Sequence, residues 1–395
     1  MKYLRRTWAE INLNAVEHNY RVIREKIDDG CKLMCVIKAD GYGHGSIVLA
    51  KEYERLGADW FAVSNIEEAI QLRQNGIHRP ILILGYTPAS MADKLDEFDI
   101  TQAVLTYEYA VALSGYSKKY GVNTNVHIKI DTGMSRIGLM FQKPERDIRT
   151  IDEIEAIAKL ENLNVNGMFS HFAVADDGDA GEEYTKTQLD CFNIAIELLK
   201  QRGIEFENYH IANSGGIIDY KCAHFNMVRA GIILYGLLPS GKIRHDADLQ
   251  GVMELKSVIS QIKVVEPDTT VSYGRTYTTT QPTKIATVPI GYADGYIRAL
   301  GQKAEMLVNG KRAKVIGRIC MDQVMLDVSH IDDIKVGDII TVFGRDHGVS
   351  LTVDEVASWS GTINYEVICL VGKRVPRLYY RNGKIVDIMD ICNLG

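Results

Sequence analysis

The sequence has no long apolar run: nothing in its 395 residues approaches the ~20 consecutive apolar residues that a membrane-spanning helix needs. Its first 20 residues, MKYLRRTWAEINLNAVEHNY, lack the apolar core of a secretory signal, so we expect a cytoplasmic protein with no membrane partner. A net charge of −6 supplies no basic surface, which argues against a nucleic-acid partner.

Patterned cysteines and histidines are also missing. The seven cysteines are scattered at positions 31, 35, 191, 222, 320, 369 and 392, which is typical of reduced cytosolic thiols and argues against a disulfide framework or a zinc site. The ten histidines show no spacing of paired metal ligands. We therefore expect no bound metal and do not favour a metal-dependent hydrolase.

What the sequence does contain is a repeated βα pattern over its first 236 residues. Helix-like stretches such as 66–76 and 185–203 lie between eight short apolar runs. These runs occupy 33–38, 60–65, 81–86, 101–106, 126–131, 165–172, 209–214 and 227–236. Alternating strands and helices require parallel crossovers, and eight such units fit a closed (β/α)8 TIM barrel. An open doubly wound sheet is the alternative.

After residue 240 the pattern becomes mostly β. The polar stretch 241–250 is interpreted as a linker, and Asn309-Gly310 between two alternating runs predicts a hairpin. The runs VGDIITVFG (336–344) and TINYEVICLVG (362–372) are interpreted as strands as well, and one short helix is predicted at 353–361. We therefore predict an α/β fold with a barrel domain over 1–240 and a mostly-β C-terminal domain over 241–395.

Lys38 is the most informative residue at a predicted strand end, where barrel enzymes keep their reactive groups. It ends the first run within VIKADGYGHG (36–45). Partial desolvation would lower its pKa and leave an amine able to form an imine with an aldehyde. The alternative is a surface lysine whose stem lies along apolar neighbours.

Two further segments suggest a bound anion. Asn-Ser-Gly-Gly (213–216) follows the seventh run, where a hydroxyl and backbone N–H groups could hold phosphate, although a plain glycine turn is the alternative. Arg229 lies in the last apolar run and must face an anion or a strong acceptor, either a cofactor ring or a structural ion pair. GYGHG (41–45) does not match the dinucleotide-binding fingerprint.

Together these segments resemble the bacterial alanine racemases over nearly the whole chain. Ten motifs in the same order carry the resemblance: TWAEINLNAVEHNY (7–20), VIKADGYGHG (36–45), IKIDTGMSRIG (128–138), SHFAVAD (170–176), HIANSGG (210–216), VRAGIILYG (228–236), VSYGRTY (271–277), VPIGYADGY (288–296), GRICMDQ (317–323) and TINYE (362–366). The resemblance implies a homodimer with shared active sites that interconverts L- and D-alanine with pyridoxal 5′-phosphate, supplying D-alanine for peptidoglycan.

The resemblance also implies which residues perform the reaction. Lys38 would carry the cofactor as an aldimine and serve as the base for the D-isomer, while Tyr273 from the partner subunit would be the base for the L-isomer. Arg136 and the partner's Met321 would contact the substrate. Lys129 matches a position that is carbamylated in some members, where its carboxylate orients Arg136.

The remaining implied roles concern the cofactor. Arg229 would face the pyridine nitrogen, and His171, which by itself reads as a structural histidine, would link Arg229 to Tyr273. The phosphate would be held by Tyr42, Ser214, Gly231, Ile232 and Tyr365.

Three other functions are alternatives to alanine racemisation. A broader racemase acting on serine or lysine is the first alternative, although Tyr365 favours alanine because related membrane-linked serine racemases tend to differ there. A decarboxylase with the same domains would use a cysteine–aspartate pair, but Cys320 and Asp322 lie in the racemase motif ICMDQ. A vitamin-B6 carrier would lack the C-terminal domain.

Overall fold

The structure is a computed structural model that describes residues 6–391. Cys392 and the first five residues, which enter the expectations about thiols and a signal sequence, lie outside this range. The chain forms two compact units, which we describe separately. The barrel unit comprises residues 17–41 and 46–249, and the β unit comprises residues up to 16, residues 42–45 and residues from 250 onward. None of the helices described has the length and apolar character needed to cross a membrane.

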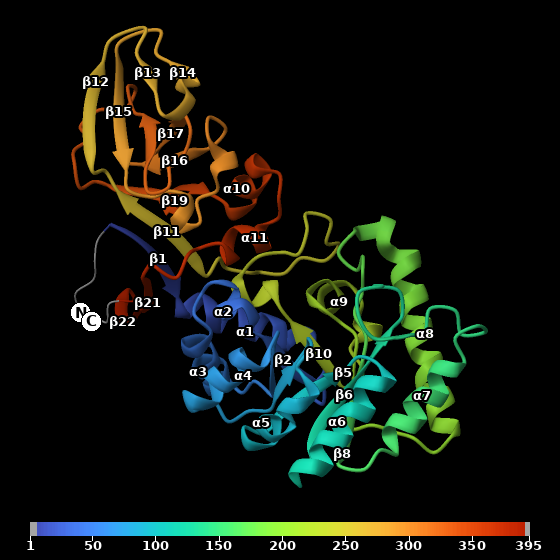
Figure 1. Ribbon diagram of the computed structural model, residues 1–395. Helices are drawn as coiled ribbons and strands as arrows, with labels where there is room; N and C mark the ends of the chain where they lie inside the picture. Colours follow the sequence, from blue (N-terminus) through green and yellow to red (C-terminus); the bar gives the residue numbers. More distant parts are fainter. Residues whose placement is uncertain (1–5, 392–395) are drawn as a thin grey trace. The chain divides into compact units, whose positions relative to one another are not determined.

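The barrel unit is built on eight parallel strands (Figure 1). They are hydrogen-bonded in the order β10-β2-β3-β4-β5-β6-β8-β9, so that the last of the eight strands lies beside the first. Their bounds are β2 Lys32–Val36, β3 Trp60–Val63, β4 Ile81–Ile83, β5 Ile100–Val104, β6 Thr124–Asp131, β8 Leu163–Phe169, β9 Asn208–His210 and β10 Met227–Ala230. Every one of the eight predicted runs overlaps one of these strands, and the predicted barrel is confirmed.

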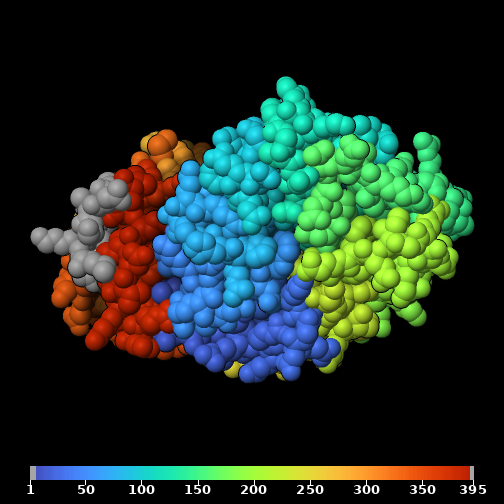
Figure 2. All heavy atoms as spheres, turned by 90° about the horizontal axis from the view of Figure 1, so that it is seen from below, coloured from blue at the N-terminus to red at the C-terminus, as the bar shows by residue number. Residues whose placement is uncertain are grey.

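Helices pack on the outside of these strands (Figure 1). In the space-filling view, their side chains follow one another in chain order around the barrel unit, from blue through cyan and green to yellow-green (Figure 2). The helices are α1 Leu13–Lys26, α3 Ser46–Leu56, α4 Ile66–Gln74, α5 Ala92–Glu97, α6 Tyr107–Tyr120, α7 Arg149–Ala158, α8 Glu182–Gln201 and α9 Ser214–Asp219. The predicted cap of α4 is confirmed, because the side chain of Asn65 accepts a hydrogen bond from the amide of Glu68.

The β unit is a large, mostly antiparallel sheet with the order β12-β15-β18-β17-β16-β19-β11-β1-β21-β22. Its strands are β1 Thr7–Asn12, β11 Met253–Val258, β12 Gln261–Val265, β15 Thr283–Val288, β16 Glu305–Val308, β17 Lys311–Ile316, β18 Val324–Asp327, β19 Ile339–Asp346, β21 Arg377–Arg381 and β22 Lys384–Met389. The N-terminal strand β1 pairs with β11 and β21. The hairpin predicted at Asn309-Gly310 is confirmed as the β16–β17 turn.

One predicted strand is wrong. The run 362–372 contains a helix, α11, over Asn364–Cys369, which follows α10 over Val353–Ser360 at the predicted short helix. The buried residues of α11 are Asn364, Val367 and Ile368, a spacing of three and four that places them on one helical face. β-branched residues made this run resemble a strand, and helical packing against the rest of the unit overrides that local preference.

Candidate active site

The segment after β2 is a tight left-handed turn. Ala39, Asp40, Gly41 and Tyr42 all have φ between 51° and 61°. Left-handed backbone costs an L-residue about 1–2 kcal/mol, so such a run persists only where the surroundings hold it. Carboxylates do this here. Glu68 Oε1 accepts from the Ala39 amide at 2.7 Å, and Asp40 Oδ1 accepts from the Ser46 amide at 2.9 Å. The half-buried Lys38 thus stands between a buried strand and a fixed turn.

Arg229 lies on β10, next to β2, and is 3% exposed. Its Nη1 donates to the carbonyl oxygen of His210 at 3.0 Å, and its Nη2 donates to those of Ser170 at 2.7 Å and Ile211 at 3.1 Å. Burial lowers the pKa of Arg229 to about 9, which leaves the guanidinium charged at neutral pH. The arginine expected to face an anion or strong acceptor is therefore fixed by main-chain carbonyls at the carboxyl ends of neighbouring strands.

The charged guanidinium determines which nitrogen of each neighbouring histidine carries the proton. Arg229 donates to His210 Nδ1 at 2.8 Å and to His171 Nδ1 at 3.1 Å, so both Nδ1 atoms are acceptors. Burial, together with the charge of Arg229, holds the pKa of both rings well below the usual value, and both are neutral. Each therefore carries its proton on Nε2. For His210 that proton points to His127 Nδ1 at 2.9 Å.

His127 extends this chain along the barrel interior. Its side chain is fully buried and burial lowers its pKa to about 3. A Cβ at Gly167, its register partner on β8, would lie 2.6 Å from the His127 ring, so the glycine makes room for the imidazole. The result is a directed hydrogen-bond chain, Arg229 to His210 to His127, that fixes the guanidinium in one orientation.

This chain predicts a loss of stability in acid. Because His127 has a pKa of about 3 when folded and about 6.5 when unfolded, the unfolded chain binds more protons in between, and stability falls as pH drops through that window. We expect His127→Leu to be about 1–3 kcal/mol less stable at pH 7.5, because His210 loses its acceptor. Between pH 6.5 and 4.5, however, its free energy of unfolding should fall less steeply than that of the wild type. The two slopes should differ by up to about 1 kcal/mol per pH unit. Urea unfolding at several pH values measures both.

The control is His78→Gln, which changes an exposed histidine of the same unit. It should leave the acid slope at the wild-type value. A His127→Leu variant with the wild-type slope would contradict the assignment of a buried neutral ring.

Ser214, Gly231 and Ile232 form a polar corner at the ends of β9 and β10. The hydroxyl oxygen of Ser214 accepts from the Gly231 amide at 3.0 Å, and all three residues are buried. Asn213 caps α9 by accepting from the Gly216 amide at 3.0 Å. Since the Ser214 hydroxyl uses its oxygen for Gly231, its proton is available to an anion.

Lys129 and Arg136 lie on β6 and in the loop after it. Lys129 is 2% exposed, and its Nζ donates to the carbonyl oxygen of Ile130 at 2.6 Å. Burial, reinforced by the charges of Arg229 and Arg136, lowers the pKa of Lys129 to about 7. The Arg136 side chain is exposed. Positive potential thus surrounds an amine that readily loses its proton.

The β unit contributes four of the predicted site residues. Tyr42 and Tyr365 lie near each other, with ring centroids 6.1 Å apart, and burial keeps the pKa of Tyr42 above its usual value, so its hydroxyl remains a donor. Tyr273 and Met321 are 67% and 53% exposed. Within the β unit the structure therefore brings Tyr42 and Tyr365 together, while Tyr273 and Met321 stand at the surface.

Sequence reasoning missed two residues of the hydrogen-bond chain, His210 and His127. A signal for both was present. His127, Lys129 and Asp131 alternate along β6 and are all buried, which places three polar side chains on the interior face. His210 is the last residue of β9, at the strand end where reactive groups collect.

Comparisons with known proteins give the family of the chain. Residues 11–239 match the family model "Alanine racemase, N-terminal domain", and residues 252–379 match "Alanine racemase, C-terminal domain". An alanine racemase of Desulfovibrio desulfuricans is 46% identical over 95% of this chain and 98% of its own. The solved alanine racemase of Clostridium difficile 630 is 42% identical with a TM-score of 0.92, covering 98% of this chain and 99% of its own. A Bartonella henselae alanine racemase solved with covalently bound pyridoxal phosphate is 26% identical with a TM-score of 0.84, covering 95% and 99%.

Proposed function

Because this chain belongs to the alanine racemase family, we propose that it interconverts L- and D-alanine with pyridoxal 5′-phosphate at the mouth of its barrel. The observation that carries the proposal is Arg229, a charged guanidinium buried at the strand ends and flanked by two neutral histidines. The experiment is a racemisation assay with L-alanine and with D-alanine, followed by circular dichroism. A circular-dichroism signal that stays constant both with L-alanine and with D-alanine would overturn the proposal.

The polar groups of the site fit pyridoxal phosphate. A phosphate needs several hydrogen-bond donors and no nearby carboxylate. From the barrel unit, the Ser214 hydroxyl proton and the Ile232 amide would be donors, while the Gly231 amide holds the Ser214 oxygen. From the β unit, the phenols of Tyr42 and Tyr365 would be donors, as the family resemblance implies. Arg229 would face the pyridine nitrogen as a charged donor that gives up its proton reluctantly.

When bound, pyridoxal phosphate withdraws electrons from the α-carbon of an attached amino acid, which makes that carbon acidic. The chain must then remove a proton from one face and return one to the other. Lys38, rigidly placed by the turn that follows it, would bind the cofactor and exchange the proton on the face that belongs to D-alanine.

Tyr273 would exchange the proton on the opposite face. A phenol with an ordinary pKa near 10 is a weak base at neutral pH, so its anion must be stabilised. His171 can do this because Arg229 occupies its Nδ1 and leaves the Nε2 proton free to be donated. The exposure of Tyr273 and Met321 favours their use in a neighbouring subunit, so we place the partner's Tyr273 opposite Lys38 in a homodimer.

Lys129 is proposed to be carbamylated. Carbamate formation needs an unprotonated amine, and a pKa near 7 provides one at pH 8. Arg229 and Arg136, which disfavour a lysine cation, would favour the carbamate anion, and that carboxylate could orient Arg136 toward a substrate carboxylate.

We therefore expect a protein-bound carbamate signal in ¹³C NMR after exchange with ¹³C-bicarbonate at pH 8, and its loss in Lys129→Gln. Lys118→Gln, at a lysine whose side chain is 71% exposed, should keep the signal. A carbamate that survives in Lys129→Gln would place the modification elsewhere.

Alanine is proposed over larger substrates because two tyrosines, Tyr365 and the partner's Tyr273, would leave little room beside the α-carbon. The alternative is a broader racemase that also accepts serine or lysine. Comparing kcat/KM for alanine, serine and lysine separates the two. We also propose a cytoplasmic location and a role in supplying D-alanine for peptidoglycan, as the family resemblance implies.

A further inference from the structure

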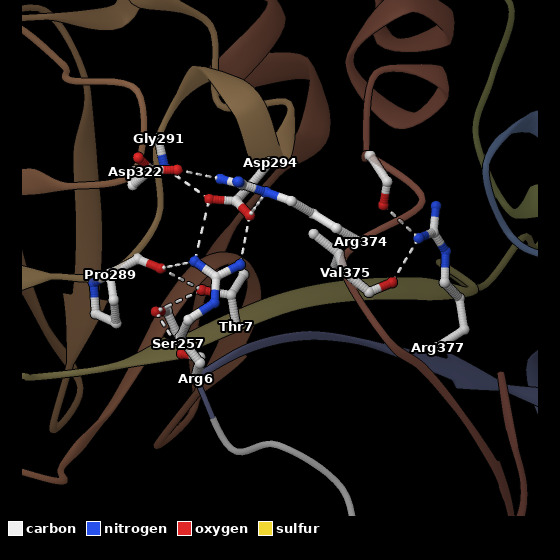
Figure 3. Close-up of polar contacts among 11 residues, drawn as sticks. Arg6, Thr7, Ser257, Pro289, Gly291, Asp294, Asp322, Arg374, Val375 and Arg377 are labelled. Carbon is white, nitrogen blue, oxygen red and sulfur yellow. Dashed lines mark hydrogen bonds and ion pairs between the residues drawn. The ribbon is translucent and has the colours of Figure 1, made fainter. Parts of the chain in front are cut away.

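Asp294 is a fully buried carboxylate of the β unit with several polar contacts (Figure 3). It lies at the end of the short helix η6 Tyr292–Asp294. Its Oδ1 accepts from Arg6 Nη2 at 2.5 Å and from Arg374 Nε at 2.8 Å, and its Oδ2 accepts from the Gly291 amide at 3.0 Å. A buried carboxylate with three charged or main-chain donors can hold its neighbours in one arrangement.

On one side this cluster holds the loop between β17 and β18, residues 317–323, which we call the Met321 loop. Arg374 Nη2 donates to Asp322 Oδ1 at 2.6 Å, so a single guanidinium bridges Asp294 and the residue after Met321 (Figure 3). The amide of Tyr292 donates to the Cys320 carbonyl at 3.2 Å, and that of Ala293 donates to the Met321 carbonyl at 3.0 Å. The approach is close, because a Cβ at Gly291 would lie 2.3 Å from both carbonyl oxygens. The loop is therefore tied by its backbone and by one side chain.

On the other side the same turn holds the chain that follows α11. The Asp294 carbonyl accepts from the Gly372 amide at 2.9 Å. Gly295 has φ +104°, and a Cβ there would lie 2.1 Å from the Leu370 carbonyl oxygen, so only glycine permits this contact. Since α11 carries Tyr365, the turn at Asp294 lies between the Met321 loop and the helix of a proposed phosphate ligand.

Arg377 connects the segment after α11 with the segment that carries Tyr42. Its side chain is 1% exposed and donates to main-chain carbonyls on both sides of it. Its Nε donates at 3.0 Å to the carbonyl oxygen of Gly43, which directly follows Tyr42. Its Nη atoms donate at 2.5–2.7 Å to the carbonyl oxygens of Val371, Gly372 and Val375. A series of polar contacts thus connects the segments that carry Met321, Tyr365 and Tyr42.

We propose that Asp294 and Arg374 are positioning residues that fix the Met321 loop against the segments of Tyr365 and Tyr42. The proposal rests on the function proposed above, in which Met321 serves the partner's active site while Tyr365 and Tyr42 serve the subunit's own. The cluster then connects the two active sites of a dimer through one rigid β unit. Displacing a contact residue by about 1 Å can cost as much as 100-fold in rate, so the tie to Asp322 is functionally significant.

Arg374 is the residue to change, because Arg6 and Gly291 still hold Asp294 without it. The matched control is Arg312, which lies in the same unit and also bridges two carboxylates, Glu305 and Glu355. The side chains of Arg374 and Arg312 are 36% and 35% exposed, so the two substitutions remove equally exposed guanidinium groups, although of their carboxylate partners only Asp294 is fully buried. Only Arg374 touches the Met321 loop.

We expect Arg374→Met in the full-length holoenzyme to raise KM for both alanine isomers about 10-fold, with a smaller change in kcat, because the substrate contact loosens while Lys38 and Tyr273 remain. Hydrogen exchange should become faster in peptides covering 289–297 and 318–323. Arg312→Met should leave KM and the exchange of both peptides at wild-type values. Arg374→Lys, which can keep one of the two ion pairs, should restore part of the KM.

An Arg374→Met enzyme whose KM and peptide exchange match those of Arg312→Met overturns the positioning role. This outcome is distinct from a failure of the proposed function, in which the wild-type protein would not racemise alanine at all. In that case the hydrogen-exchange comparison alone decides whether Arg374 holds the Met321 loop.

Discussion

Replacing Lys38 by alanine is expected to lower racemisation by at least about 10³-fold, because the residue is proposed to supply both the attachment of the cofactor and one of the two bases. Borohydride treatment of the wild-type holoenzyme should fix pyridoxal phosphate to Lys38, and peptide mapping should recover the label on the peptide that contains it. The same treatment of Lys38→Ala should give no label.

The control for this prediction is on the same strand. Lys32 begins β2 at the opposite end of the barrel, where its Nζ pairs with Glu207 at 2.7 Å. Lys32→Ala should keep both the label on Lys38 and most of the activity. A label found on another lysine of the wild-type protein would refute the central assignment, whatever the activity of the variants.

Mixed dimers are expected to recover activity from two inactive chains. Tyr273→Phe alone should lose about 10²–10⁴-fold as a missing general base. A dimer of one Lys38→Ala chain and one Tyr273→Phe chain would contain one site with both bases intact. Random mixing of equal amounts should therefore restore about a quarter of the wild-type activity, since about half of the dimers are mixed and each has one good site.

The matched control combines Lys38→Ala with a chain that carries both substitutions. No dimer of that pair contains a complete site, so mixing should recover nothing. Differently tagged chains verify that exchange has occurred. If verified mixed dimers of the first pair also stay inactive, Tyr273 does not act across the subunit boundary.

Local patterning was sufficient to predict the barrel. A strand buried on both faces reads as a short apolar run, and each of the eight runs coincides with a strand because helices cover the outside and side chains fill the inside. The same reasoning was wrong at 362–372, where α11 forms. There β-branched residues occur at both strand and helix spacing, and packing within the unit decides between them.

Some residues of the candidate site could be predicted from the sequence and others could not. Lys38, Ser214 and Arg229 were visible because a polar residue at the end of an apolar run is costly unless it has a partner or a task. The left-handed turn at 39–42 was not, because only one of its four residues is a glycine and the turn is held by a contact of Ala39 with Glu68 and of Asp40 with Ser46. His127 and His210 meet only because the sheet places β6 and β9 on either side of β8, since 83 residues separate them.

The sequence by itself determined the family, the order of the barrel strands and the identity of the groups at the strand ends, because these follow from local periodicity and motif. Only the tertiary structure decided how those groups are held. Arg6 reaches Asp294 across 288 residues, and Arg377 reaches Gly43 across 334. Such contacts leave no local pattern, because an arginine is satisfied by whichever carboxylates or carbonyls the fold places around it.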